Sequence, residues 1–470
     1  MKIGRIDSLP LRSIARALLV LLLCGLAEPG STYAAGAPPG ALSRERASST
    51  RDFYVSPEGD DAASGTTTSA PWRTLARVDS APLRAGDHVH LEGGATFRAT
   101  LAPYAGMTGT EQDPIVFDSY GHGRASLAGG IYLNSVSNLT FEHLDVTSVG
   151  KGVFSAAGGH GAQGIVLDDL TISDVPLAGI SSNNRSDTDW LVDGVRIART
   201  GDSGIYFLAS KFTIADSTIT TTGLRPSIGY PRHGIYAAGP MPTIVDNTIT
   251  QSSTSGISLR YQDAVVEGNR ISGGARGISF EEQATSAGTT RIAYNAISNV
   301  TDSGIVVARS AIESFIVANN TIRGSGAYGM YFQVVPNLTL ANNIIQATTL
   351  NARLLSVRLP SVTYNEHNNL WYGGSDAPFY WNGASRTFTG YRSDSRRGLG
   401  DITRNPMLGF NLVPTVGSPA LDAGSAIVEP SLKYRGLCDG RSFSYCGRAP
   451  DLGAFERGAR SARDVRPGRR

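Results

Sequence analysis

Short runs of alternating apolar and polar residues recur along the middle of this chain, with turn residues between them. Ile257-Ser258-Leu259-Arg260 and Ile278-Ser279-Phe280-Glu281 are two examples. A period of two predicts strands that each bury one face, and no helical spacing of apolar residues runs through this region. The alternation therefore predicts an all-β structure built from many short strands.

These runs return at regular intervals. A glycine followed by an apolar residue recurs about every 24 residues, at Gly179, Gly204, Gly234, Gly256, Gly277, Gly304 and Gly329. An asparagine followed two positions later by Ile or Leu forms a second series, at Asn247, Asn269, Asn295, Asn320, Asn343 and Asn368. Such a period predicts a β-solenoid, in which each coil buries its apolar face against its neighbours. We predict a structural role for the asparagines, in a left-handed turn with the amide bonded to the next coil.

The two ends of the chain have different compositions from the middle. Residues 1–35 combine basic residues, the apolar run 17–26 and small residues after it, which is the pattern of a secretory signal peptide. Residues 36–50 predict a linker, and the arginine-rich tail 458–470 has nothing apolar to pack, which predicts disorder. We therefore expect a secreted or periplasmic protein with no membrane-spanning segment after the signal is removed.

Cysteine content and charge bear on disulfide bonding and on the kinds of partner the protein can bind. After signal removal, Cys438 and Cys446 are the remaining cysteines, and in an oxidising compartment we expect a disulfide between them. The formal net charge of +2 comes from mixed charges and predicts no nucleic-acid partner.

The region between the ends resembles a known family. We expect an N-terminal capping module over residues 51–130, coils over 131–370 and an irregular C-terminal capping module over 371–457. The motifs are Phe53-Tyr54-Val55-Ser56-Pro57-Glu58-Gly59-Asp60, Pro71-Trp72-Arg73-Thr74-Leu75 and Asp451-Leu452-Gly453-Ala454-Phe455-Glu456. With the coils, they are similar to secreted bacterial right-handed parallel β-helix proteins of the pectate-lyase-like superfamily. The resemblance implies a right-handed parallel β-helix, and the superfamily includes polysaccharide lyases, uronan epimerases, glycoside hydrolases and non-catalytic surface proteins.

The repeat is interrupted by one long insertion. From the aliphatic residue of a coil to the next glycine there are six or seven residues in the ordinary coils, but Ile219 is fifteen residues from Gly234. The extra residues lie within 221–233, which ends in Tyr230-Pro231-Arg232-His233. A solenoid gains no packing from such a loop, whereas binding and catalytic residues often lie on one. The insertion therefore predicts a functional site around His233.

Strand alternation places further polar side chains on the exposed sheet beside this insertion. The outward positions are Tyr206, Tyr236, Arg260, Arg276, Glu281 and, further along, Tyr331, and the insertion adds Tyr230 and Arg232. Aromatic rings, guanidinium groups and a carboxylate on one face of the sheet predict a surface that binds a sugar polymer. For His233 alone, a solvated surface position explains the sequence equally well. A ladder of salt bridges along the sheet would likewise explain Glu281.

These residue types fit β-elimination from a uronic acid. Arg260 and Arg276 would hold the substrate carboxylate, His233 would remove the C5 proton, and Tyr236 or Tyr206 would donate a proton. The sequence therefore predicts a monomeric polysaccharide lyase that acts on an acidic polysaccharide. Calcium neutralises the carboxylate in many such lyases, but the outward positions show no compact group of Asp and Glu. An arginine-based reaction is favoured, and no cofactor is assigned.

Other activities stay open. A glycoside hydrolase needs two carboxylates roughly 5–9.5 Å apart, and the candidates Glu281, Glu282, Asp202, Asp302 and Asp263 form no clear pair. The tetrapeptide 230–233 is faintly similar to the Asp-Pro-His-Asp box of mannuronan epimerases, but it lacks both acids. A non-catalytic protein that binds a polysaccharide would tolerate single changes on this face.

Overall fold

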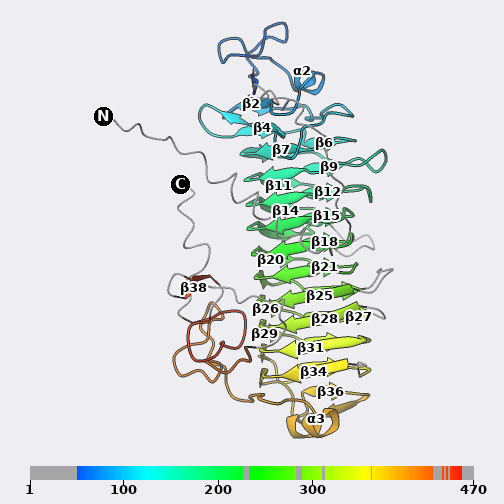
Figure 1. Ribbon diagram of the computed structural model, residues 1–470, viewed down its shortest axis with the longest axis vertical. Helices are drawn as coiled ribbons and strands as arrows, with labels where there is room; N and C mark the ends of the chain where they lie inside the picture. The colour runs from blue at the N-terminus through cyan, green and yellow to red at the C-terminus, as the bar shows by residue number, and fades with distance from the viewer. Residues whose placement is uncertain are drawn as a thin grey trace, which may run out of the picture. The chain divides into compact units, whose positions relative to one another are not determined.

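The structure, a computed structural model, describes residues 50–225, 232–281, 288–309, 313–360, 363–426, 437–438, 441–442 and 445–457. Within these ranges the chain winds into a β-solenoid with three long sheets, whose strands lie above one another in Figure 1. The predicted signal peptide, most of the linker and the arginine-rich tail lie outside the described residues and stay predictions. No helix in the described ranges is long and apolar enough to cross a membrane.

Most coils contribute one strand to each of the three sheets. Sheet A contains, in spatial order, β1 (Asp52–Val55), β2 (His88–Glu92), β4 (Ile115–Tyr120), β7 (Leu139–Glu142), β10 (Val166–Asp168), β13 (Leu191–Asp193), β16 (Thr213–Ala215), β19 (Thr243–Val245), β22 (Val265–Glu267), β25 (Gly288–Ala293), β28 (Glu313–Ala318), β31 (Asn337–Ala341) and β34 (Thr363–His367). Sheet B contains β3 (Thr96–Phe97), β5 (Ala125–Leu127), β8 (Leu144–Val146), β11 (Thr171–Val175), β14 (Arg196–Thr200), β17 (Thr218–Thr222), β20 (Thr248–Ser252), β23 (Arg270–Ser272), β26 (Ala296–Val300), β29 (Thr321–Ser325), β32 (Ile344–Gln346) and β35 (Leu370–Tyr372). Sheet C contains β6 (Ile131–Leu133), β9 (Val153–Ser155), β12 (Ile180–Ser182), β15 (Ile205–Phe207), β18 (Ile235–Ala237), β21 (Ser255–Leu259), β24 (Arg276–Glu281), β27 (Ser303–Arg309), β30 (Tyr328–Phe332), β33 (Arg353–Val357), β36 (Phe379–Trp381) and β37 (Ala384–Arg386). The neighbours are parallel except for β36 and β37, which are antiparallel.

The recurring glycine is required by close packing between sheets B and C. A Cβ atom on Gly277 would lie 2.5 Å from the carbonyl oxygen of Gly304 and 2.6 Å from Cγ2 of Ile297. Ile297 is the aliphatic residue of the asparagine series and is fully buried. The two sequence series therefore record one packing constraint, in which the aliphatic side chain fills the space that glycine leaves.

The asparagine ladder is present from Asn247 onward. The side-chain amide of each ladder residue donates to Oδ1 of the next at 2.9–3.0 Å, through Asn247, Asn269, Asn295, Asn320, Asn343 and Asn369. The last member is Asn369, and the prediction of Asn368 was wrong. Ile345 is in register with Trp371, which places the ladder position two residues before Trp371.

The left-handed turn lies one residue earlier than predicted. Positive φ angles fall on the residue before each ladder asparagine, for example 58° at Asp246, 56° at Tyr294 and 51° at Asn368. Asn368 therefore shapes the turn, while the next residue supplies the amide. The ladder asparagines are selected for hydrogen bonding and burial rather than for an unusual backbone conformation.

Both ends of the coil stack are covered. The short helix α2 (Leu75–Asp79) is capped by Thr74 and buries Leu75 and Val78. Sheet A already begins at β1, so parallel strands start inside the segment predicted as a cap. At the other end β36 continues sheet C beyond residue 370, and α3 (Phe388–Ser395) packs Tyr391 against this last coil.

The C-terminal segment packs along sheet B. Leu452 and Ala420 form a buried cluster with Ile344 and Leu370. Ala454 N–H donates to the Thr321 hydroxyl at 2.9 Å. The short hairpin of β38 (Leu437–Cys438) and β39 (Arg441–Ser442) also belongs to this segment.

A buried pair of carboxyl groups ends the asparagine ladder. Glu366 Oε1 accepts from the Asn369 side chain at 2.7 Å, and Asp401 Oδ1 accepts from the Asn369 backbone N–H at 2.8 Å. Burial, with a further contribution from the Asp401 charge, raises the pKa of Glu366 to about 9. Glu366 therefore keeps its proton at neutral pH in the folded protein.

We expect Glu366→Gln to stabilise the protein at pH 8, by roughly 1–3 kcal/mol, and to change little at pH 5. The folded state holds a proton on Glu366 that the unfolded chain releases above its ordinary pKa of 4.5. The stability of the parent must then fall as the pH rises from about 4.5 towards about 9. Urea unfolding at pH 5 and pH 8 measures this difference, with the exposed Glu111→Gln as control. An equal effect at both pH values would contradict the shift.

Candidate functional site

The strand register brings the predicted outward residues of sheet C into one row. The row runs through Tyr206, Tyr236, Ser258, Ser279, Val306 and Tyr331. The neighbouring row contains Arg260, directly after β21, and Glu281 at the end of β24, each two positions further along the chain. His233 lies two residues before β18, where its side chain meets the backbone of Ser255. Contacts join six of the predicted residues into one group: Tyr206, His233, Tyr236, Arg260, Arg276 and Glu281.

Three aromatic rings stack at the centre of this group. The Tyr206 and Tyr236 rings lie 5.0 Å apart with an angle of 14°, because their strands pair in register. The His233 ring lies 5.5 Å from Tyr236 at 18°, and the Arg260 guanidinium lies 5.5 Å from the Tyr236 centroid. Burial raises the pKa of Tyr206, with a further contribution from Tyr236. Tyr206 is therefore a protonated hydroxyl at neutral pH.

His233 is buried, with 3% of its surface exposed. Its Nδ1 accepts from Ser255 N–H at 3.3 Å, and its Nε2 is buried without a hydrogen-bond partner. Burial, followed by the charges of Arg260 and Arg276, lowers the pKa of His233 to about 3. The ring is therefore neutral, with its proton on Nε2, so it is a hydrogen-bond donor. The predicted role as a base would require Nδ1 to lose the bond from Ser255, and the geometry favours a positioning role behind Tyr236.

An ion-pair network joins the predicted arginines. Arg260 pairs with Glu281 Oε2, and Arg276 lies 3.7 Å from Glu281 Oε1. Arg276 Nε also donates to Asp302 Oδ2 at 3.0 Å. Arg276, Glu281 and Asp302 each expose about a third of their side chains, so a ligand can reach them. Both carboxylates form ion pairs with arginine, so this network does not group carboxylate oxygens as calcium ligands.

Arg232, a described residue of the insertion, takes a structural role rather than the predicted binding role. Arg232 is almost fully buried, and its Nε lies 3.7 Å from Asp202 Oδ1 while its backbone N–H donates to Thr254. This arrangement anchors the end of the insertion. Tyr230 and Glu282 lie outside the described residues.

Tyr331 belongs to a separate hollow on sheet C. A pocket of about 350 Å³ is lined by Tyr328, Tyr331, Arg353, Ser356, Arg358 and Tyr380. Tyr331 lies four strands from Tyr236, which is about 19 Å at the usual strand spacing. The structure therefore does not bring Tyr331 to the His233 group.

Sequence reasoning missed the arginines and Tyr380 of this second hollow. The repeat is hidden there, because Leu354 stands at the position that glycine occupies in earlier coils. The alternation Leu355-Ser356-Val357-Arg358 was the available signal, since it places Ser356 and Arg358 on the outer face.

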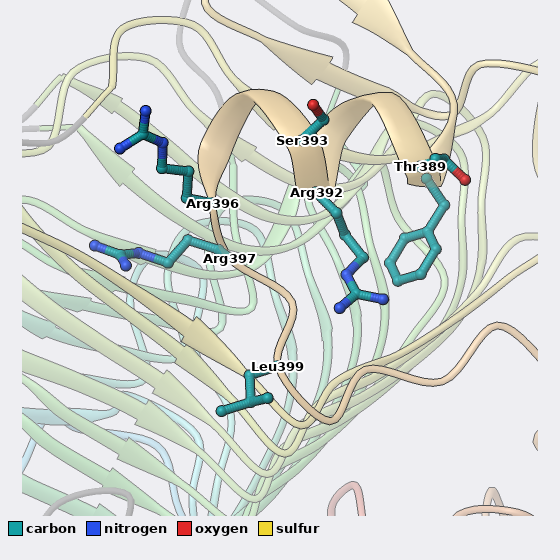
Figure 2. Close-up of a pocket in the computed structure, with 7 residues that line it drawn as sticks. Thr389, Arg392, Ser393, Arg396, Arg397 and Leu399 are labelled. Carbon is teal, nitrogen blue, oxygen red and sulfur yellow. The ribbon is translucent and has the colours of Figure 1, made fainter.

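A third hollow lies at α3. It has a volume of about 550 Å³ and is lined by Phe388, Thr389, Arg392, Ser393, Arg396, Arg397 and Leu399. Figure 2 shows Arg396 and Arg397 extending to one side, while Arg392 points another way. These guanidinium groups do not converge on one point, so we assign no site here.

Cys446 is disulfide-bonded. The side chain of Cys438 lies outside the described residues, so its pairing with Cys446 stays a prediction.

Comparisons with known proteins agree with this architecture. The sequence family described as "Right handed beta helix region" matches residues 210–356. Pectate lyase Pel9A superimposes with a TM-score of 0.54 and 18% identity, over 87% of this chain and 96% of that chain. The chain is a right-handed β-helix with the pectate-lyase-like fold.

Two further proteins resemble this β-helix. The complex of XylC with xylose superimposes with a TM-score of 0.50 and 12% identity, over 76% of this chain and 87% of that chain. Lacto-N-biosidase of Bifidobacterium longum subsp. longum is 29% identical over 177 residues, which are 36% of this chain and 10% of that protein. The matched part is about a tenth of the length of this curated relative. These likenesses support the fold and leave the activity to the residues of the site.

Proposed function

We propose that this β-helix is an enzyme that cleaves an acidic polysaccharide by β-elimination on the outer face of sheet C. The stack of Tyr206, Tyr236 and His233 beside the Arg260 guanidinium is the observation that carries the proposal. Flat rings provide a surface for a pyranose, and guanidinium groups bind carboxylates through paired hydrogen bonds. The predicted signal peptide supports action outside the cytoplasm.

The arginines would recognise the uronate. On binding, the substrate carboxylate would take the place of Glu281 between Arg260 and Arg276, which already converge on Glu281. Two cations beside the carboxylate would stabilise the negative charge that develops when the C5 proton leaves. The ion pairs therefore hold the guanidinium groups in position before the substrate arrives.

The tyrosines would transfer the protons. Tyr236 would take the C5 proton on its phenolic oxygen after its own proton has passed to solvent, with Arg260 over its ring to offset the charge. The bond from C4 to the leaving oxygen would break, a C4–C5 double bond would form, and Tyr206 would protonate the leaving oxygen. The raised pKa of Tyr206 keeps that proton available. His233 would hold the Tyr236 ring by stacking.

Hydrolysis is the second candidate. Glu281 and Asp302 both contact Arg276, at 3.7 and 3.0 Å, so two carboxylates flank one exposed cation. A pair of carboxylates is what a glycoside hydrolase uses. The partial match to a lacto-N-biosidase adds weight to this alternative.

Product analysis on a panel of uronic-acid polymers separates these activities. We expect ultraviolet absorbance from unsaturated sugar ends to rise on one polymer, and to rise equally when calcium is chelated, because arginines neutralise the carboxylate. New reducing ends without absorbance would replace elimination by hydrolysis. If neither signal appeared on any polymer, both enzymatic proposals would fail and a binding role would remain.

A further inference from the structure

A second group of reactive side chains lies on the outer face of sheet A, at its first three strands, which are blue to cyan in Figure 1. Strand β2 buries Val89 and Leu91, so His88 and His90 share the outer face. Register places Asp52 of β1 beside His88. None of these residues belongs to the sheet C site.

The geometry of this group approaches that of a metal site. One ligand atom from each of Asp52, His88 and His90 lies within 4.8 Å of the others. In a tetrahedral zinc site with bonds of about 2.1 Å, the ligand atoms are about 3.4 Å apart. Asp52 is exposed and His88 is half-buried, so side-chain rotation can close the remaining distance of about 1.4 Å.

His90 is already held in the orientation of a ligand. Its Nδ1 lies 2.6 Å from Asp118 Oδ1, and its Nε2 lies 3.1 Å from Asp52 Oδ1. A carboxylate that accepts from Nδ1–H commonly supports zinc-binding histidines. The Nε2–H that donates to Asp52 would lose its proton when a metal binds at that nitrogen. The Tyr54 ring, 5.0 Å from His90, walls one side of the group and keeps the imidazole in place.

We propose that Asp52, His88 and His90 bind a divalent transition-metal ion such as zinc, with Asp118 orienting His90. Two imidazoles and a carboxylate favour zinc over calcium or magnesium, which prefer oxygen ligands. The ion would link β1 to β2. Because β1 is the edge strand of sheet A and pairs only with β2 in that sheet, the metal would fasten the first strand to the coil stack.

Zinc titration into EDTA-treated, untagged full-length chain tests this site. We expect one ion per chain, with a dissociation constant of about 10 µM or tighter, and a higher Tm when zinc is bound. His88→Ala and His90→Ala should each weaken binding at least tenfold, and Asp118→Asn should weaken it about tenfold by freeing the His90 ring. His122→Ala changes an exposed histidine of a nearby turn and should bind zinc as the parent does.

Circular dichroism in EDTA establishes that each variant is folded. The conservative Asp52→Asn change removes the charge of one proposed ligand at an exposed position. Binding that survives both histidine changes would overturn the proposal. So would the absence of zinc binding by the parent at about 100 µM. Neither result would affect the sheet C activity, because the two groups share no residue.

Discussion

Replacing Tyr236 with phenylalanine should reduce turnover of the polymer substrate at least about 100-fold while leaving the fold unchanged. The phenylalanine ring keeps the stacks with Tyr206 and His233 and the contact with Arg260, so only the phenolic O–H is lost. The effect should fall mainly on kcat, because the ring surface that binds the sugar remains. Initial rates of double-bond formation across substrate concentrations measure it.

A matched control lies on the same sheet. Tyr132 is on β6, where its ring lies 5.0 Å from Phe154, and it is four strands away from Tyr236. Tyr132→Phe should therefore leave turnover within about twofold of the parent. Equal losses in both variants would mean that the hydroxyl groups matter for the sheet in general, and an unchanged Tyr236→Phe rate would remove the proton-transfer role.

The largest stability effect is expected at the centre of the asparagine ladder. Asn295→Leu should lower the free energy of unfolding by about 3 kcal/mol or more, although leucine has a similar shape. The Asn295 amide is fully buried and donates to the carbonyls of Val266 and Ala293 and to Asn320 Oδ1. Leucine would leave these acceptors, and the two N–H donors of Asn269, without their partner.

Denaturant unfolding followed by circular dichroism measures this loss. Asn337→Ala is the control, since Asn337 is exposed and its side chain makes one hydrogen bond, to Ser314. We expect the control to change stability by less than about 0.5 kcal/mol. Similar values for the two variants would show that the ladder amides are not the source of the stability.

The solenoid could be predicted because its packing restricts residue types. The aliphatic side chain at Ile297 leaves no room for a Cβ on Gly277, so the constraint is visible as a repeated glycine. Where another residue fills that position, as Leu354 does, the coil continues but the sequence signal disappears. The mistaken choice of Asn368 has a similar cause, because two adjacent asparagines serve the turn and the ladder, and residue type alone does not distinguish them.

The rows of the site could be predicted, but their contacts could not. Alternation along a strand decides which face carries Tyr236 or Arg260. The protonation state of His233 depends instead on its burial, on two nearby guanidinium charges, and on a backbone N–H 22 residues away. Likewise, the spacing of His88 and His90 is visible in the sequence, whereas Asp52 reaches them only through strand pairing.

From Asn247 to Asn343 the ladder amides point the same way, because each donates its side-chain N–H to the asparagine of the following coil. Each junction between coils within the ladder therefore presents the same donor and the same acceptor. If a whole coil were duplicated or deleted together with its asparagine, the asparagines on either side would pair in the same way. No amide would then be left without its partner. The fold can thus lengthen or shorten by whole coils, and the sheet C face would change by about 4.8 Å with each one.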